Sequence, residues 1–370
     1  MIIKRGKTWT YSIDLGWEFD ENGEKKRKRT WKGGFPTKGA AEIARAEHVT
    51  RLDRGEYIEP SDITVGEWLK TWLAGRPNLA DTTRVGYRYE VKRLTRVFGP
   101  RKLQQLTPDT IEVFYRDLTE QGYSPKTVKN CHGVLNKALK DAVRKSVLVR
   151  NPADGLELPR LKRPKMEVWT ADELRQFLNH TESHRLHAAF VLMIHSGMRR
   201  SELLGLRWRS VDWDNNRISI VDTVVPVDNR PVLRSDETKT KGSRRVIALD
   251  DWPMSVLRRH RVHQVEEQVA AGVAYNDQDL VFADEIGGIV SPDWFTRTTK
   301  QMAAEAGVTP LTPQSARHTW ATIALSQGVP AKVVQERLGH SSINITLDRY
   351  SHLVNGMDRT AAEVFAAAIR

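Results

Sequence analysis

Four short stretches in the C-terminal half of the chain gather cationic, imidazole and phenolic side chains that together could act on a phosphate. Arginine binds phosphate oxygens through paired hydrogen bonds, and tyrosine can serve as a covalent nucleophile. Each stretch alone is ordinary, because such residues usually form surface ion pairs or helix caps. Their order along the chain is therefore the informative observation. The stretches contain Arg199 and Glu202, then Lys239 and Lys241, then Gln314, Arg317 and His318, and finally His340, Tyr350 and His352.

The neighbouring residues predict how these side chains are presented. Gly197, next to an expected helix start, puts Arg199 on a turn, where its guanidinium can be aimed. Lys239 and Lys241 fall in a polar, glycine-containing stretch that precedes the apolar strand 246–249. This pattern predicts a hairpin turn that carries a mobile lysine.

The charge of the chain favours a polyanionic partner. The 370 residues carry a net charge of +12. Residues 58–165 have 21 Lys and Arg against 12 Asp and Glu, whereas residues 166–370 are nearly balanced. The middle segment is therefore the best candidate for a broad surface that binds a nucleic-acid backbone.

Several other classes of protein are disfavoured. Cys131 is the only cysteine, so an intrachain disulfide is impossible, and no Cys/His set has zinc spacing. The chain has no signal-peptide pattern and no apolar run of about 18 residues, so we expect a cytoplasmic protein without a membrane partner. No glycine lies five residues before Gly6, so the Gly6-Lys7-Thr8 stretch is not a phosphate loop, which argues against ATP chemistry.

Residues 1–57 are predicted to form a small strand-rich unit that ends in a helix. Trp9, Tyr11 and Ile13 alternate as in a half-buried strand, and Thr37 can cap a helix that runs to about Asp53. A basic run between these elements has two interpretations, a solvated loop or a β-ribbon whose face meets DNA. The run consists of Lys25, Lys26, Arg27, Lys28 and Arg29.

Residues 62–160 are predicted to be helical, with helices at about 65–74, 81–97, 108–120 and 125–145. Thr107-Pro108 and Ser124-Pro125 each pair a capping side chain with proline at the first helical position. In the last helix an apolar stripe faces the core, and the opposite side, which includes Lys126 and Lys129, is a candidate for phosphate contacts. The linker that follows carries four cations, among them Arg163 and Lys165, and would suit a path along a DNA backbone.

Residues 166–370 are predicted to form a third, mainly helical α+β domain. It opens with a capping box at Thr170 and Glu173 and contains a short strand region at about 217–249. The expected fold class is thus multidomain: a small sheet with a helix, an all-α domain, and a helical domain with a small sheet.

The ordered set of motifs resembles the tyrosine recombinase family, specifically the phage-type integrases. The stretches from Gly197 to Glu202 and from Leu338 to His352 are similar to the two most diagnostic motifs of that family. The resemblance covers 166–370 at motif level. Residues 62–160 look like the family's core-binding domain, and residues 1–57 look like its three-stranded arm-binding domain.

The resemblance implies roles residue by residue. Arg199 and Arg317 match the arginines that grip the scissile phosphate, and His340 matches the histidine that hydrogen-bonds it. Tyr350 matches the nucleophile that forms a 3′-phosphotyrosine. The remaining matches are Lys239, or alternatively Lys241, as the acid that protonates the leaving 5′ oxygen, Glu202 as the residue that orients Arg199, and His352 as a supporting residue.

One position departs from the family pattern. Gln314 stands where the family usually has histidine or lysine, and glutamine cannot carry a proton near neutral pH. Either the enzyme is slower, or His318 or a water molecule substitutes, or the position was altered to trap a complex.

The resemblance implies an integrase that recombines double-stranded DNA attachment sites as a homotetramer, for a prophage or another mobile element. DNA-bending and excision factors would be further partners, and no cofactor is expected, because a phosphotyrosine conserves the energy of the broken bond. The apolar tail at 360–369 either packs on its own domain or docks onto a neighbouring protomer. The alternatives are a non-catalytic DNA-binding member of the fold, which Gln314 favours, and a topoisomerase that acts without partners.

Overall fold

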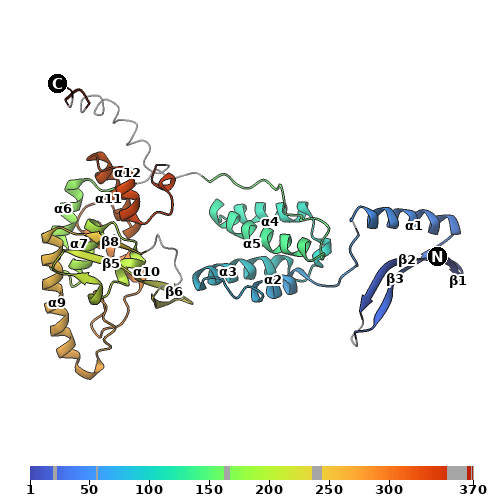
Figure 1. The fold of residues 1–370 in the computed structure, drawn as a ribbon, viewed down its shortest axis with the longest axis horizontal. Coiled ribbons are helices and arrows are strands. Elements are labelled where there is room, and N and C mark those ends of the chain that lie inside the picture. The colour runs from blue at the N-terminus through green and yellow to red at the C-terminus, as the bar shows by residue number, and fades with distance from the viewer. Residues whose placement is uncertain are drawn as a thin grey trace. The chain divides into compact units, whose positions relative to one another are not determined.

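The computed structural model describes residues 1–19, 23–55, 57–161, 167–235, 244–347, 365–367 and 369. The chain divides into two compact units, Met1–Lys162 and Arg163–Arg370. The first unit contains a small sheet with one helix and then a group of helices, and the second is mainly helical with small sheets (Figure 1). This arrangement confirms the predicted fold class.

The N-terminal sheet is antiparallel, and a helix follows it. The Thr37 hydroxyl caps that helix as predicted, by accepting a hydrogen bond from Ala40 N at 3.1 Å. Tyr11 and Ile13 are buried, and Tyr11 Oη lies 3.0 Å from Nδ1 of His48 on the helix. The strand order is β1-β2-β3, and the elements are β1 (Ile2–Arg5), β2 (Thr8–Phe19), β3 (Lys25–Phe35) and α1 (Lys38–Asp53).

The basic run forms the start of strand β3. Its residues pair with the C-terminal half of β2, where Lys25 lies opposite Phe19 and Arg29 lies opposite Asp14. Of the two interpretations of the run, the structure therefore selects the β-ribbon over the loop. Contact of the ribbon with DNA stays a prediction.

Two helices in the second half of the first unit begin at the predicted caps. Thr107 and Ser124 each accept a hydrogen bond from a backbone N–H in the first turn, and proline follows each of them. The apolar stripe of the last helix is buried, together with Cys131, as predicted. Trp68 Nε1 donates to Ala138 O at 2.9 Å and thereby joins helix Val65–Ala74 to helix Pro125–Arg144. The elements are α2 (Val65–Ala74), α3 (Asp81–Phe98), η1 (Leu103–Gln105), α4 (Pro108–Glu120) and α5 (Pro125–Arg144).

The second unit is built around helix α7, which is buried on nearly all sides. A helix without a polar face must run through a core, and Phe190 of α7 packs between Phe177 and Phe295 of two neighbouring helices. The predicted capping box is present, because Glu173 N donates to Thr170 Oγ1 and Thr170 N donates to the Glu173 carboxylate.

Short strands and further helices surround α7. The strands form one antiparallel sheet in the order β4-β5-β8 and a separate hairpin of β6 and β7, all within or next to the predicted strand region. The helices are α6 (Ala171–His180), α7 (His187–Ser196), α8 (Arg200–Leu204), η2 (Trp208–Ser210), α9 (Asp251–Ala271), η3 (Gly272–Ala274), α10 (Pro292–Glu305), α11 (Pro313–Ser326) and α12 (Ala331–Leu338), and the strands are β4 (Val211–Asp212), β5 (Arg217–Ile220), β6 (Asp222–Val227), β7 (Arg230–Ser235) and β8 (Arg245–Ala248).

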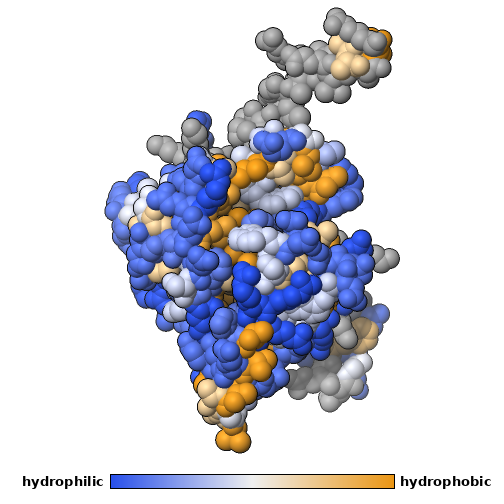
Figure 2. Space-filling model, turned by 90° about the vertical axis from the view of Figure 1, so that its left-hand side faces the viewer, coloured by the Kyte–Doolittle hydropathy of each residue, from blue (hydrophilic) through white to orange (hydrophobic). Residues whose placement is uncertain are grey.

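Helix α9 forms one edge of the second unit. Its inner face buries Met254, Leu257 and His260, and its outer face exposes valines. The surface on this side is mostly hydrophilic, with apolar groups at its lower end and further apolar groups in its upper half (Figure 2). Within the described ranges, none of the helices is both long and apolar enough to cross a bilayer. The exposed valines of α9 are Val262, Val265 and Val269.

Candidate functional site

Two helices of the second unit end close to each other. Helix α7 is followed by Gly197 at φ +66°, and helix α12 is followed by Gly339 at φ +64°. Both glycines hold the left-handed conformation that commonly terminates a helix. A Cβ on Gly197 would lie 3.0 Å from the Leu338 side chain, so the close approach of the two ends requires glycine there. The last carbonyl oxygens of a helix have no partner inside the helix and need donors from elsewhere.

Arginine side chains supply these donors. Arg317 donates to Gly197 O at 2.8 Å and also to Leu338 O, so it joins the two helix ends. Arg199 donates to Gly339 O at 2.8 Å. The negative end of a helix dipole favours cations at such a position. Two further contacts complete what we call the arginine cluster: Arg245 Nε donates to Arg337 O at 2.6 Å, and Arg337 Nη2 donates to His195 O at 3.0 Å.

Glu202 is the buried carboxylate of the arginine cluster. Its Oε1 accepts from Arg199 Nη1 at 2.7 Å, and its Oε2 accepts from the Arg199 backbone N–H at 2.9 Å. Arg245 donates to both oxygens, at 3.1 and 2.7 Å. Burial alone would raise the pKa of Glu202, but the hydrogen bonds and charge of Arg245, with the charge of Arg199, outweigh it and lower the pKa to about 2. Glu202 is therefore ionised at neutral pH and fixes both the backbone and the guanidinium of Arg199.

His340 lies directly after Gly339 at the same helix end. Its Nδ1 lies 2.9 Å from Thr346 Oγ1, and Thr346 is fully buried. Gln335 Nε2 donates to the His340 carbonyl oxygen at 2.9 Å. The imidazole therefore has a fixed place beside the arginine cluster. The fold thus brings four of the predicted site residues together, namely Arg199, Glu202, Arg317 and His340.

Gln314 lies in the first turn of helix α11, on the helix that also carries Arg317. It is exposed, whereas Arg317 is only 1% exposed. Gln314 Nε2 lies 3.4 Å from Nε2 of the buried His318, one helical turn away. Gln314 is therefore accessible at the start of the helix, whereas the Arg317 side chain is covered.

Six predicted residues lie outside the described part of the structure. The described residues therefore include those predicted to bind the phosphate but not the predicted nucleophile and general acid, and all of these roles stay predictions. The six are Arg163, Lys165, Lys239, Lys241, Tyr350 and His352.

Sequence reasoning does not single out Arg245 or Arg337. Arg337 lies over the Trp320 ring at 4.8 Å, and burial together with the charge of Arg245 lowers its pKa below the usual value. A weak signal is present in each case. Arg245 opens an otherwise apolar strand, and Arg337 lies in the last turn of a helix, where cations are favoured.

The candidate DNA contacts of the first unit lie on accessible elements. Lys25, Lys26, Arg27 and Arg29 are exposed along β3, and Lys28 is half-buried and pairs with Glu59 at 2.9 Å. Two aromatic–cation contacts support the ribbon, because Lys25 and Arg27 both lie over the Trp17 ring. The other two candidates are Lys126 and Lys129 in the first turns of α5.

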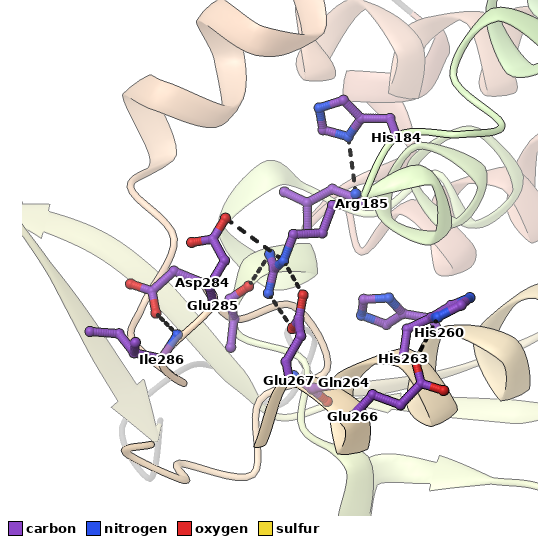
Figure 3. Close-up of polar contacts among 12 residues, drawn as sticks. His184, Arg185, His260, His263, Gln264, Glu266, Glu267, Asp284, Glu285 and Ile286 are labelled. Carbon is purple, nitrogen blue, oxygen red and sulfur yellow. Dashed lines mark hydrogen bonds and ion pairs between the residues drawn. The ribbon is translucent and has the colours of Figure 1, made fainter. Parts of the chain in front are cut away.

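A separate cavity of about 420 Å³ shares no residue with the arginine cluster. Figure 3 shows its polar groups, most of which bind one another. Arg185 binds Glu267 through two hydrogen bonds of 2.5 and 2.7 Å and donates to Ala283 O, and His260 Nε2 lies 2.7 Å from Val281 O. Among the described residues, no three His, Cys, Asp or Glu side chains are placed to share a metal ion.

Comparison with protein families gives three matches in chain order. The Phage integrase family model matches residues 167–356, which is more than half of the chain. The Arm DNA-binding domain model matches residues 1–52, and the phage integrase N-terminal SAM-like domain model matches residues 64–119. The chain belongs to the phage integrase family. It is a tyrosine recombinase, which confirms the family and the enzyme class predicted from the sequence.

Relatives within the family include integrases of mobile elements. A Tyrosine recombinase XerC-like protein of Caldanaerobacter subterraneus subsp. tengcongensis is 30% identical over 98% of this chain and 96% of its own length. The ICEBs1 integrase of Bacillus subtilis is 27% identical and covers 98% of both chains.

Solved structures of integrases share the fold. A Tn1549 transposon integrase in complex with transposon right end DNA is 18% identical, with a TM-score of 0.69 over 81% of this chain and 100% of that chain. A lambda integrase tetramer bound to a Holliday junction is 16% identical, with a TM-score of 0.56 over 90% of this chain and 94% of that chain.

The ionisation of Glu202 predicts a specific pH dependence of stability. Its pKa falls from an ordinary value of 4.5 to about 2 in the folded chain, so its contribution is fully present above pH 4.5 and is lost as the pH falls toward 2. We expect Glu202→Gln to lower the free energy of unfolding at neutral pH by on the order of 3 kcal/mol, and the difference to shrink in acid.

Urea unfolding of the wild type and of Glu202→Gln from neutral to acidic pH measures this difference. Glu182→Gln, at an exposed position of the same unit, is the control and should leave stability unchanged throughout. A Glu202→Gln difference that stays constant down to the acid limit would contradict the lowered pKa.

Proposed function

We propose that the chain is a site-specific DNA recombinase that cleaves and rejoins strands through a 3′-phosphotyrosine intermediate and so integrates or excises a mobile element. The observation that carries the proposal is the convergence of Arg199, Arg317 and His340 on the end of helix α12. This end lies ten residues before Tyr350 in the chain. Two guanidinium groups and an imidazole in one place suit a phosphodiester.

The arginines would stabilise the charge that grows during the reaction. Attack on the phosphodiester makes phosphorus five-coordinate and concentrates negative charge on its non-bridging oxygens. Carbonyl groups and Glu202 hold Arg199 and Arg317 close to the end of α12 before DNA binds. Arg317 is 1% exposed, so it would turn some of its N–H groups from carbonyl oxygens to the phosphate. His340 would add a hydrogen bond to the same phosphate.

The covalent step would conserve the energy of the broken phosphodiester bond. The Tyr350 phenolic oxygen would bond to phosphorus while the bond to the 5′ oxygen breaks, and Lys239 or Lys241 would give its proton to that oxygen. The products are a 3′-phosphotyrosine and a free 5′-hydroxyl. A 5′-hydroxyl of another strand can reverse the step, which rejoins DNA in a new combination. His352 would support this step from its place two residues after the nucleophile.

The same proposal gives each part of the chain its own role. Residues 1–57 would bind arm-type DNA sites with the basic ribbon of β3, residues 62–160 would hold the core site, and residues 166–370 would carry out the chemistry. Arg163 and Lys165 in the linker would follow the DNA backbone. The relation to the lambda integrase tetramer on a Holliday junction supports a homotetramer on double-stranded attachment sites. DNA-bending and excision factors would assist, and the reaction would take place on cytoplasmic DNA.

Gln314 favours a second candidate, an attenuated or non-catalytic DNA-binding member of the fold. The residue is exposed at the start of α11 and cannot take the phenolic proton. His318, whose Nε2 lies 3.4 Å from the Gln314 amide, is the nearby group that can exchange protons. The intact set of Arg199, Arg317 and His340 weighs against the second candidate.

A suicide substrate, nicked next to the cleavage site, distinguishes the two candidates. The nick releases a short strand after cleavage, so a covalent protein–DNA adduct accumulates. We expect the wild type to form an adduct and Tyr350→Phe to form none while binding the same DNA with similar affinity, because only the attacking oxygen is lost. Denaturing gel electrophoresis measures the adduct. Absence of an adduct with the wild type, together with normal DNA binding, would favour the non-catalytic candidate.

Restoring a titratable side chain at position 314 should speed cleavage. General acid–base help is typically worth about 10²–10⁴-fold, so we expect Gln314→His to accelerate adduct formation by at least the lower part of that range at neutral pH. Gln314→Asn, which shortens the amide but adds no proton acceptor, is the matched control and should not accelerate it. An unchanged rate for Gln314→His would mean that another group already removes the phenolic proton.

A further inference from the structure

Arg245 is a buried member of the arginine cluster. Its side chain is 8% exposed, and the Glu202 side chain that it contacts is 5% exposed. It donates two hydrogen bonds to the Glu202 carboxylate and a third to Arg337 O at the end of α12. Arg245 therefore links strand β8 to α8 and to the helix end that holds Arg199.

The shared carboxylate creates an electrostatic problem for Arg199. Glu202 orients Arg199 through its backbone and its guanidinium, but a buried carboxylate also cancels the charge of its partner. A cation whose charge is cancelled attracts a phosphate weakly. Because Arg245 contacts both oxygens of the carboxylate, one negative charge is shared between two guanidinium groups, and the group as a whole stays positive.

We propose that Arg245 is a positioning residue that acts as the counter-ion of Glu202 and so leaves the charge of Arg199 available to the scissile phosphate. Arg245 itself would not touch the DNA. The inference rests on the proposed function, because it concerns how the proposed phosphate site keeps its positive charge.

The packing around Arg245 supports a dedicated place for its guanidinium. A Cβ on Gly339 would lie 3.0 Å from Arg245 Nη1 and 3.2 Å from its Cζ. The glycine that ends α12 thus also makes room for Arg245. The carbonyl of the same glycine accepts a hydrogen bond from Arg199, so both arginines lie next to Gly339.

A charge-balanced pair of variants tests the proposal. Arg245→Met removes the hydrogen bonds from Arg245 to Glu202, so the carboxylate pairs with Arg199 and cancels its charge. The variant should therefore slow adduct formation on the suicide substrate by about 10²-fold. Adding Glu202→Gln removes the carboxylate charge as well. The double variant should therefore cleave roughly tenfold faster than Arg245→Met alone, since its Arg199 is no longer neutralised. DNA affinity before cleavage and thermal unfolding are measured for each variant.

The Arg185–Glu267 pair provides the matched control. It is another doubly hydrogen-bonded arginine–glutamate pair of the same unit, and it is partly buried (Figure 3). Arg185→Met and Arg185→Met with Glu267→Gln should leave the cleavage rate of the folded protein unchanged. This control separates loss of a partly buried ion pair in general from loss of the counter-ion of Glu202.

The cleavage rates of the variants distinguish a counter-ion role of Arg245 from a purely structural one. A double variant as slow as Arg245→Met or slower would overturn the counter-ion role and leave a purely structural one, and an Arg245→Met rate equal to wild type would also overturn it. If Arg245→Met does not fold, Arg245→Lys, which keeps a cation, should stay within about tenfold of wild type, and a folded but inactive Arg245→Lys would contradict the proposal. Failure of the wild type to form any adduct would instead contradict the proposed function.

Discussion

The unsatisfied carbonyl oxygens at the ends of helices α7 and α12 are the constraint on which the site depends. Such oxygens must find donors, and here the donors are arginine side chains from four places in the chain. The same hydrogen bonds that complete the helices also gather positive charge in one place. Stability and the proposed binding of a phosphate would therefore have a common physical origin, and the buried Glu202 holds two of the arginines in place.

The rest of the second unit holds these helix ends still. Helix α7 is buried on nearly all sides and packs through Phe190 against aromatic side chains of neighbouring helices, so its C-terminal end has little freedom. Helix α12 packs through Val334 and Leu338 in a small cluster of its own with α11. This second contact fixes the end that carries His340. The phage integrase family model matches residues 167–356 and so includes this helix end.

Local signals in the sequence predicted much of this structure. Thr107 and Ser124, each followed by proline, fixed the helix starts because capping depends on neighbouring residues alone. Whether the basic run forms a loop or a β-ribbon depended on its pairing with β2, which no local signal could predict. Arg245 escaped prediction for a similar reason, since its partner Glu202 lies 43 residues away in the chain. The ordered set of Arg199, Arg317 and His340 was predictable only because the resemblance to a family joined distant stretches.

A crystal structure of the chain with nicked DNA and orthovanadate tests the central claim most directly. Vanadate can adopt the five-coordinate geometry of the transition state between the Tyr350 oxygen and a 5′-hydroxyl. The account predicts Arg199 and Arg317 within about 2.7–2.9 Å of the vanadate oxygens, with Glu202 still bound to Arg245. A vanadate held elsewhere, or an Arg199 whose guanidinium remains wholly engaged with Glu202 and the Gly339 carbonyl, would contradict it.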